Sequence, residues 1–308
     1  MARRRKGRAV HGWVVVDKPS GPTSTRAVGI VRRVFDARKV GHGGTLDPMA
    51  SGLLPIALGE ATKTVSFVMD GEKTYRFTAR WGQATETDDT EGAVIAESEH
   101  RPEEADITAI LPRFTGELEQ VPPAFSAIKV GGQRAYDLAR AGADFELEAR
   151  PVTISHLELI EQPDRDHATF EARCGKGAYM RALARDLGAA LGTCAHIVAL
   201  RRTQVGPFAM ADAISLESLE SLGHSAAAFE HLLPVRAALD DIPVLSLTEF
   251  EANRLRCGQA VSLLARANRE RIRDLTKGAI VCAMSADTPV ALARYEGGEI
   301  RPVRVLNL

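Results

Sequence analysis

The sequence predicts an α+β protein with a large main domain and a small, mostly-β domain at its C-terminal end. The chain has 308 residues, of which 45% are hydrophobic and 26% charged, enough for a sizeable core and two domains. Strand-like and helix-like segments intermingle as far as about residue 238. Beyond Asp240 and Asp241 the text changes to short strand-like segments, so we expect a main domain over 11–238 and a second domain over 239–308.

The first half of the main domain carries clear local signals. Residues 13–16 are apolar and mostly β-branched, which predicts a strand that ends before a Pro- and Gly-rich turn. Thr23 or Ser24 is expected to cap a helix with one apolar face, and an apolar stretch with a short helix covers 53–69. Residues 73–81 alternate apolar and polar, the clearest strand in the chain, with 93–97 as its returning strand across the acidic turn 83–92.

The second half of the chain continues this mixture. We expect helices over 103–115 and 175–192, the latter closed by Gly192, and strands over 151–161, 168–174 and 196–206. Residues 121–150 break the pattern, with two prolines and three glycines around a short helical piece at 136–140; such long irregular stretches tend to be functional. The C-terminal domain is expected to contain strands over 277–285, 289–298 and 300–308.

Charge is distributed unevenly along the chain. Residues 1–41 carry a net charge of +9 and the remainder −10, although the whole chain has a formal charge of −1. The basic N-terminal arm, residues 1–10, indicates either a polyanionic partner or a solubilising tail. No apolar run is long enough to span a membrane, no signal peptide core follows the arm, and the four cysteines are scattered. These features favour a cytoplasmic protein.

One carboxylate stands apart in the segment "VGHGGTLDPMASGLLP", residues 40–55. Asp47 is its only charged side chain apart from any charge on His42, and three glycines precede it. Asp followed by Pro is typical of a helix start, so a capping role is one interpretation. A carboxylate in a glycine-rich pocket can alternatively act as a nucleophile, with glycines that admit a closely approaching ligand. Local sequence does not decide between the two.

The common catalytic motifs are absent from the sequence. It contains no H-E-x-x-H or clustered Cys/His pattern, no phosphate-binding loop, no G-x-G-x-x-G and no G-x-S-x-G. We therefore expect no metal and no cofactor. What remains is a single carboxylate with arginines and tyrosines available to support it.

At this point the residues resemble a known family. "DKPSG", "GHGGTLDPMASGLLPIALGEATK", "KTYRFTARWG", "PPAFSAIKVGGQRAYDLAR", "GKGAYMRALARDLG" and "HIVALRRTQVGPF" are similar, in order and spacing, to the TruB family of tRNA pseudouridine-55 synthases. The resemblance covers about residues 10–210, and more weakly the tail. It implies a pseudouridine synthase fold, with a mixed, largely antiparallel sheet flanked by helices, and a PUA-like C-terminal domain. Gly43 departs from the pattern, since many relatives carry Thr or Ala there; we expect it to affect loop stiffness more than chemistry.

The resemblance implies a role for particular residues. Asp47 matches the catalytic aspartate, and Arg181 matches the arginine that pairs with it. Tyr75 matches the active-site tyrosine, which is expected to stack on the base and to help remove the C5 proton. Taken alone, Tyr75 reads as an inward-facing strand aromatic and Arg181 as part of a solvated helix face. Tyr179 and Leu200 match residues that line the base pocket.

Further positions match residues of the RNA-binding surface. His42 matches the histidine that fills the space vacated by a flipped base, although alone it reads as a turn residue. Lys18 matches a residue that supports the active-site loop, although alone it reads as a surface lysine. Residues 121–150 match the mobile RNA-binding insertion, whose cations suit phosphate contacts: Lys129, Arg134, Arg140 and Arg150.

The function implied is isomerisation of uridine-55 in the T loop of tRNA, with no cofactor, no required protein partner and no membrane. The T-stem and loop are expected to suffice as substrate, the C-terminal domain to touch the acceptor arm, and the chain to be a monomer by default. A tRNA-folding chaperone is the alternative, alone or alongside catalysis. A carboxylate glycosidase is a third reading; it needs a second acid, and none stands in a comparable sequence context. A guide-RNA-dependent relative is disfavoured by the insertion and by the absence of long charged extensions.

Overall fold

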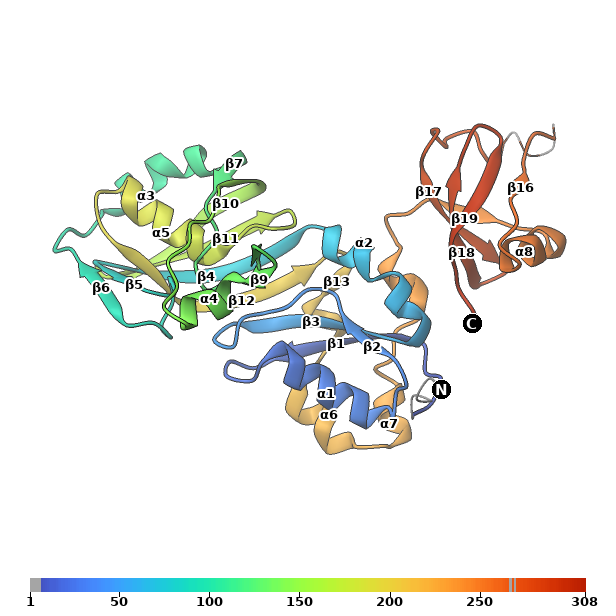
Figure 1. The fold of residues 1–308 in the computed structure, drawn as a ribbon, viewed down its shortest axis with the longest axis horizontal. Helices are drawn as coiled ribbons and strands as arrows, with labels where there is room; N and C mark the ends of the chain where they lie inside the picture. The colour runs from blue at the N-terminus through green and yellow to red at the C-terminus, as the bar shows by residue number, and fades with distance from the viewer. Residues whose placement is uncertain (1–6, 266–267, 269) are drawn as a thin grey trace.

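The computed structural model describes residues 7–265, 268 and 270–308, and in this part of the chain two sheets dominate (Figure 1). The larger sheet contains ten strands, in the order β14 (Ala213–Ser215), β1 (Gly12–Lys18), β3 (Ser51–Leu58), β12 (Ala195–Val205), β4 (Lys73–Trp81), β11 (His167–Cys174), β10 (Arg150–Asp164) and β7 (Gly116–Gln120), with β13 (Phe208–Ala209) beside β12 and β2 (Val40–His42) beside β3.

This sheet is mixed and largely antiparallel, which confirms the predicted fold class. Only β1 with β14 and β3 with β12 pair in parallel among its described strands. The β3–β12 pairing brings Gly52 opposite Arg202, so the start of β3 lies directly against β12. Because the Asp47 loop precedes β3, this pairing places that loop beside the centre of the sheet.

Helices cover the sheet at two places (Figure 1). Helix α5 (Met180–Ala190) packs on β12 and β4, while α3 (Glu104–Ile110) and the 3₁₀ turn η2 (Leu111–Phe114) pack on β10. Helix α1 (Ser24–Val34) lies along β1 and β3 beside α6 (Leu216–Leu222), which in turn contacts α7 (Ala226–Phe229). Two apolar cores result, one beneath α5 around Trp81 and Phe170, and one beneath α1 around Phe35.

The predicted helix caps are present. The Thr23 hydroxyl accepts a hydrogen bond from the Arg26 N–H at the start of α1, at 3.2 Å, which satisfies one of the free amides there. Gly192 follows α5 with a φ of +71°, the left-handed conformation that glycine adopts at least cost. Helix α5 begins at Met180, five residues later than expected, because Tyr179 keeps extended dihedrals.

Three expectations about local structure are corrected. Asp47 and Pro48 start no helix, since residues 45–50 form an irregular loop that leads into β3. Strand β6 (Val94–Glu97) pairs with the short β5 (Gln83–Thr85) in a separate hairpin rather than with β4. Most of the basic N-terminal arm, residues 1–6, lies outside the described residues.

The smaller sheet contains the strands expected near the C-terminus and two more. In the described residues its order is β15 (Val244–Ser246), β17 (Ile280–Ser285), β18 (Thr288–Tyr295), β19 (Glu299–Val305) and β16 (Val261–Ser262), with α8 (Glu249–Arg256) packed against it. It has an apolar core of its own, so the tail is a small, mostly-β unit. The boundary at residue 238, within the 3₁₀ turn η4 (Val235–Ala238), stays a prediction.

The smaller unit is tied back to the main one at its last residues. The Lys63 ammonium, in the 3₁₀ turn η1 (Gly59–Lys63), donates to the Val305 carbonyl at 2.7 Å. The Asn307 N–H donates to Glu60 at 2.8 Å, and Leu306 is buried in the core of the main unit. Within the described residues, no helix combines the length and apolar character needed to cross a membrane.

Candidate active site

The Asp47 loop is held at both ends by α1 and the turn before it. The Ser24 hydroxyl donates to the Leu46 carbonyl at 2.9 Å and accepts from the Leu46 N–H at 2.8 Å. On the other side of Asp47, the Gly21 N–H donates to the Pro48 carbonyl at 2.8 Å. The carboxylate therefore projects from a backbone that is hydrogen-bonded immediately before and after it, which limits its movement.

Lys18 joins the same two segments from inside the protein. Its ammonium donates to three carbonyls, those of Pro19 and Pro22 at 2.9 Å and that of Pro48 at 3.2 Å. The residue is fully buried, so the interpretation as a surface lysine is wrong. Burial lowers the pKa of Lys18 to about 8, opposed in part by the negative charge of Asp47. Three N–H donors meet three acceptors, and this supports the expected role in shaping the loop.

Arg202 supports the segment before Asp47 and was not singled out from the sequence. It is 2% exposed, and its guanidinium donates to the carbonyls of Gly44 at 3.0 Å, Thr45 at 3.3 Å and Leu53 at 2.8 Å. A buried arginine that satisfies three carbonyls fixes the glycine-rich turn as a rigid element. The only sequence signal was the double arginine in a strand whose other residues are mostly apolar.

Asp47 forms an ion pair with Arg181, as the resemblance implied. The Arg181 Nε lies 2.9 Å from Asp47 Oδ2, and the guanidinium also donates to the carbonyls of Thr87 at 2.8 Å and Phe125 at 3.0 Å. The Arg181 side chain is 4% exposed and that of Asp47 39% exposed. The solvated-face interpretation of Arg181 is therefore wrong: the cation is buried and presents Asp47 to the solvent side.

A second acid shares this arginine. Asp89 Oδ2 lies 3.5 Å from the same Nε, and the Asp89 side chain is 3% exposed. Its other oxygen accepts from the Thr87 hydroxyl at 2.5 Å and the Glu91 N–H at 2.9 Å. The sequence offered no second acid in a comparable context, because the segment 83–92 was interpreted only as a turn, and the structure now brings Asp89 to the same arginine as Asp47. The run of acids in this segment, beside a strand, was the signal available.

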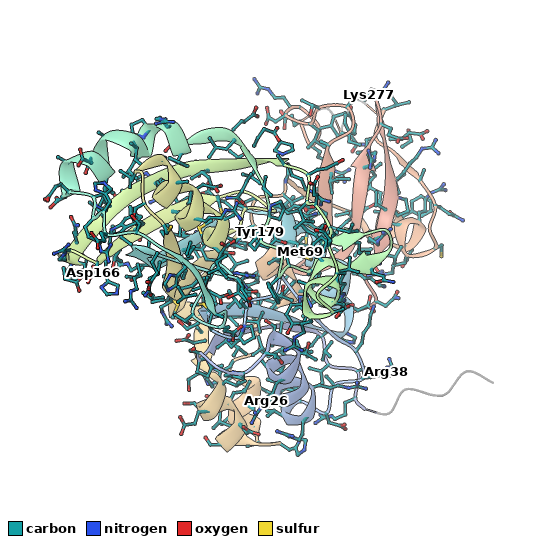
Figure 2. The ribbon with its side chains drawn as sticks, turned by 60° about the vertical axis from the view of Figure 1, so that its left-hand side comes forward. Arg26, Arg38, Met69, Asp166, Tyr179 and Lys277 are labelled. Atoms are coloured by element: carbon teal, nitrogen blue, oxygen red, sulfur yellow. The ribbon has the colours of Figure 1, made fainter. Side chains whose placement is uncertain are left out.

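Asp47 lies between two hollows. The inner one, of about 110 Å³, is lined by Thr45, Leu46, Asp47, Tyr75, Ala178, Tyr179, Met180, Arg181 and Leu200. The outer one, of about 490 Å³, includes Asp47, Tyr179 and Arg181 and is otherwise lined by the Thr23 turn, the segment 87–91 and the insertion. The structure thus gathers Asp47, Tyr75, Tyr179, Arg181 and Leu200 around one small cavity. Tyr179 lies in the central part of the molecule in Figure 2.

The two tyrosines are held as neutral phenols. Burial raises the pKa of Tyr75 and also that of Tyr179, where the nearby charge of Asp47 acts in the same direction. A neutral ring with one edge buried is suited to stacking on a flat, uncharged base. Leu200, 8% exposed, completes the apolar side of the cavity.

The insertion contributes cations at the rim of the outer hollow. It contains a two-stranded hairpin, β8 (Lys129–Val130) and β9 (Gln133–Arg134), followed by α4 (Ala135–Arg140). Arg134 lines the outer hollow, and Arg140 lies over the Tyr136 ring at 4.8 Å. Arg150 stands where the insertion returns to β10. Lys129, Arg140 and Arg150 line neither hollow, and a phosphate-binding role for all four cations stays a prediction.

His42 also lines neither hollow. It ends β2, and its Nδ1 accepts from the Gly44 N–H at 3.3 Å. Burial lowers the pKa of His42, and the charge of Arg202 adds to this, so the ring favours its neutral form. A neutral aromatic ring on the glycine-rich turn is compatible with the expected insertion into a gap between bases, which stays a prediction.

Close packing against α2 explains why residue 43 is a glycine. A Cβ atom built at this position would lie 2.7 Å from Val68 Cγ1 in α2 (Val65–Asp70). At Gly43, therefore, the space beside the backbone is filled by Val68 from within the protein, and the expected effect of this glycine on loop stiffness stays a prediction. Gly44, with a φ of +115°, is the position where the turn needs the conformational freedom of glycine.

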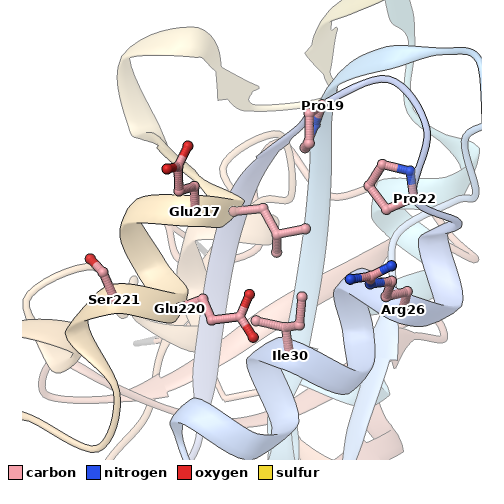
Figure 3. A pocket seen from close by; sticks show the side chains of 8 residues that line it. Pro19, Pro22, Arg26, Ile30, Glu217, Glu220 and Ser221 are labelled. Atoms are coloured by element: carbon pink, nitrogen blue, oxygen red, sulfur yellow. The ribbon is translucent and has the colours of Figure 1, made fainter.

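A further hollow, of about 490 Å³, lies between α1 and α6 (Figure 3). Arg26 and Ile30 from α1 face Glu217 and Glu220 from α6, with Pro19 and Pro22 at its end. It shares no lining residue with the two hollows beside Asp47. In the described ranges no group of three or more His, Cys, Asp or Glu side chains is arranged to hold a metal ion.

Comparison with known proteins assigns this geometry to a family. The model of the TruB family pseudouridylate synthase N-terminal domain matches residues 32–180, and that of the tRNA pseudouridylate synthase B C-terminal domain matches 181–240. The chain is 57% identical over 308 residues to tRNA pseudouridine synthase B of Rhodospirillum rubrum, with both chains covered completely. It is 55% identical over 309 residues to the protein of that name from Caulobacter vibrioides, again over the whole of both.

Solved structures give the same fold. A crystal structure of a Cbf5-Nop10-Gar1 complex is similar with a TM-score of 0.75 and 25% identity, over 96% of this chain and 85% of that one. An H/ACA RNP bound to a substrate RNA containing 2'-deoxyuridine also reaches a TM-score of 0.75, at 22% identity, over 100% of this chain and 92% of the other. The second likeness concerns the fold alone.

Proposed function

The chain belongs to the TruB family of pseudouridylate synthases, and we propose that Asp47 is the nucleophile with which it acts. The protein is a tRNA pseudouridine synthase that isomerises uridine-55 of tRNA. The observation that carries the assignment is identity above half over the whole chain with two proteins of that name. The structure adds a solvent-facing carboxylate paired with a buried arginine at the mouth of a small cavity.

The proposed chemistry exchanges one glycosidic bond for another. Asp47 attacks either C6 of the uracil or C1′ of its ribose, and the N1–C1′ bond breaks. The detached base turns within the inner cavity, C5 bonds to C1′, the C5 proton leaves and Asp47 is released. Atoms and electrons balance without an external oxidant or reductant. Arg181 orients the carboxylate throughout, and its burial makes the pairing stronger than in water.

The base must leave the RNA stack to reach Asp47. We propose that it flips into the inner cavity against Tyr75, Tyr179 and Leu200. Because burial raises the pKa of Tyr75, its neutral phenol stacks on and orients the base, and this disfavours the expected role as the base that removes the C5 proton. The outer hollow then receives the neighbouring nucleotides, with Arg134 at its rim for the phosphates.

We further propose that the T-stem and loop suffice as substrate and that the smaller sheet touches the acceptor arm. RNA recognition of this type depends on the shape of a folded loop and on splayed bases. We also propose that the chain acts as a cytoplasmic monomer without a protein partner. Size-exclusion chromatography with light scattering, followed by assay of the same fraction, tests this. Activity confined to a dimer or to a mixture with other proteins would contradict it.

The decisive experiment measures tritium release from a T-arm transcript that carries [5-³H]uridine. Conversion to pseudouridine expels the C5 hydrogen, so release reports the bond exchange itself. The wild type should release tritium, and Asp47→Asn, which keeps the shape but not the charge, should bind the RNA without release. Binding without release by the wild type, with full-length tRNA as well, would leave a tRNA-folding chaperone instead.

A further inference from the structure

The two ends of the insertion meet at one residue pair. Gln120 is the last residue of β7 and Arg150 the first of β10, and they are opposite each other in the antiparallel pairing of these strands. Residues 121–149 therefore leave and re-enter the sheet at a single point. Whatever Gln120 contacts is linked to the base of the insertion.

The Gln120 side chain forms two hydrogen bonds with the backbone of Tyr179. Its Oε1 accepts from the Tyr179 N–H at 2.8 Å, and its Nε2 donates to the Tyr179 carbonyl at 3.2 Å. Gln120 is 4% exposed, so neither bond is readily replaced by water. The two bonds resemble one rung of a β-ladder made by a side chain instead of a backbone.

Tyr179 has few other constraints. It precedes α5 with extended dihedrals, φ −113° and ψ 117°, and it makes no side-chain cap. Its carbonyl accepts the first helical hydrogen bond, from Leu183 at 3.0 Å. The amide of Gln120 thus fixes the backbone of Tyr179 and with it the position of the side chain. Tyr179 lines both hollows beside Asp47.

Two arginines of α5 tie the next residues of the insertion to the same helix. Arg185 donates to the Val121 carbonyl at 2.8 Å, and Arg181 donates to the Phe125 carbonyl at 3.0 Å. Gln120, Val121 and Phe125 are therefore bonded to Tyr179, Arg185 and Arg181, respectively. A shift of the insertion at its base displaces the start of α5, which carries both the pocket tyrosine and the partner of Asp47.

We infer that Gln120 is a positioning residue: it sets Tyr179 in the base pocket and transmits the position of the RNA-binding insertion to that pocket. The inference rests on the proposed function. It separates RNA binding, which the cations of the insertion provide, from alignment of the base, which needs Tyr179 in register with Asp47. Loss of Gln120 should therefore slow the chemical step more than it weakens binding.

The test is Gln120→Met, which keeps the length of the side chain and loses both hydrogen bonds. With the T-arm transcript, kcat should fall about ten- to a hundredfold while KM stays within about twofold, because misalignment rather than binding is affected. The matched control is Gln162→Met at the far end of β10, whose amide donates to the Pro102 carbonyl at 3.1 Å and touches nothing in the site. It should leave both constants unchanged.

A double-mutant cycle distinguishes positioning from general support. If Gln120 acts through the Tyr179 ring, Gln120→Met should have little further effect on kcat in a Tyr179→Ala background. A purely structural role predicts that the two losses multiply. Should Gln120→Met not fold, Gln120→Glu is the second variant: its protonated carboxyl can make both hydrogen bonds, whereas its ionised form sets an oxygen against the Tyr179 carbonyl. The kcat of Gln120→Glu should therefore fall relative to the wild type as the pH is raised.

The outcomes separate this inference from its premise. Tritium release by the wild type with unchanged kcat in Gln120→Met overturns the inference and leaves the proposed function intact. A raised KM with unchanged kcat, or losses that multiply in the cycle, also overturns it. No release by the wild type overturns the proposed function, and the positioning role with it.

Discussion

The Asp47 loop and the insertion over 121–149 face each other across the outer hollow but are held in different ways. The loop is anchored along its length by buried polar side chains, among them Lys18, Ser24 and Arg202. The insertion is bonded to the rest of the protein mainly at its first residues, and most of its side chains are exposed. The difference agrees with the two roles that we propose, Asp47 as a nucleophile held in a fixed position and the insertion as a peripheral RNA-binding element.

This comparison also explains where charge is buried. Around Asp47 the cations satisfy backbone carbonyls or carboxylates and cannot be removed without leaving a buried group unpaired. In the insertion the cations lie in or near solvent, where one charge is worth little to folding and is available to phosphate. Substitutions on the two sides should therefore affect different measured constants.

The largest effect is expected at Arg181. Arg181→Met leaves Asp47 misoriented and the buried Asp89 unpaired, so kcat should fall about a hundred- to a thousandfold. For the same reason the free energy of unfolding should drop by about 3–5 kcal/mol. Single-turnover tritium release and urea unfolding measure the two. Arg185→Met, which removes a more exposed arginine of α5, is the control and should cost less in both; equal losses would contradict the comparison.

The next effect concerns Lys18 and pH. Its pKa is about 8 in the folded protein and about 10.4 when unfolded, so between these values only the unfolded chain holds the proton. The free energy of unfolding should therefore rise with pH in that window. Activity should fall over the same range, because the neutral amine has two N–H donors for three carbonyls.

Urea unfolding and single-turnover rates at about pH 7 and about pH 8.5 check both directions for Lys18. The lower limit of the window lies within this interval, and the RNA stays largely intact there. In Lys18→Met the single-turnover rate should be the same at both pH values, and it should be lower than that of the wild type at each. Parallel pH profiles in the wild type and Lys18→Met would show that another group is responsible.

A moderate effect is expected at Gly43. Gly43→Ala forces its new methyl group against Val68, so the free energy of unfolding should drop by about 1–3 kcal/mol. Val68→Ala in the same chain should recover part of this loss, which a double-mutant cycle measures. Gly29→Ala in α1, where a Cβ meets nothing within 4 Å, should be neutral or slightly stabilising. Additive losses at Gly43 and Val68 would mean that the loop is not held by this contact.

The smallest effect is expected in the insertion. Arg134→Ala should weaken binding of the T-arm RNA a few-fold and reduce the salt dependence of the Kd by about one unit of slope, with kcat unchanged at saturation. Titration at several salt concentrations measures this. Arg301→Ala in β19, paired with Glu296 and Glu299, is the control and should not alter binding of the isolated T arm. A lower kcat for Arg134→Ala would contradict the proposal that the insertion contributes to RNA binding and not to the chemical step.

Much of the fold was predictable because its signals are local. The alternation over 73–81 marks β4, and Thr23 and Gly192 mark the ends of helices. The hairpin of β5 and β6 was misassigned because a returning strand can pair with any neighbour of suitable length, and pairing is decided across the sheet. The loop at Asp47 was ambiguous, since Asp-Pro is equally compatible with a helix start and with a turn.

By itself, the sequence singled out Asp47, Tyr75, Tyr179, Arg181 and Leu200 through the resemblance of its motifs to the TruB family. The structure gathers these five residues around one cavity, and their roles in the reaction stay predictions. Only the tertiary structure revealed which charges are buried. Lys18, Arg202 and Asp89 look like surface residues in sequence, because a charged side chain is rarely buried without a partner and no charged or polar side chain nearby in the sequence indicates one. The partners of Lys18 and Arg202 are backbone carbonyls. Every residue carries a carbonyl, so no sequence pattern indicates which ones will accept these hydrogen bonds.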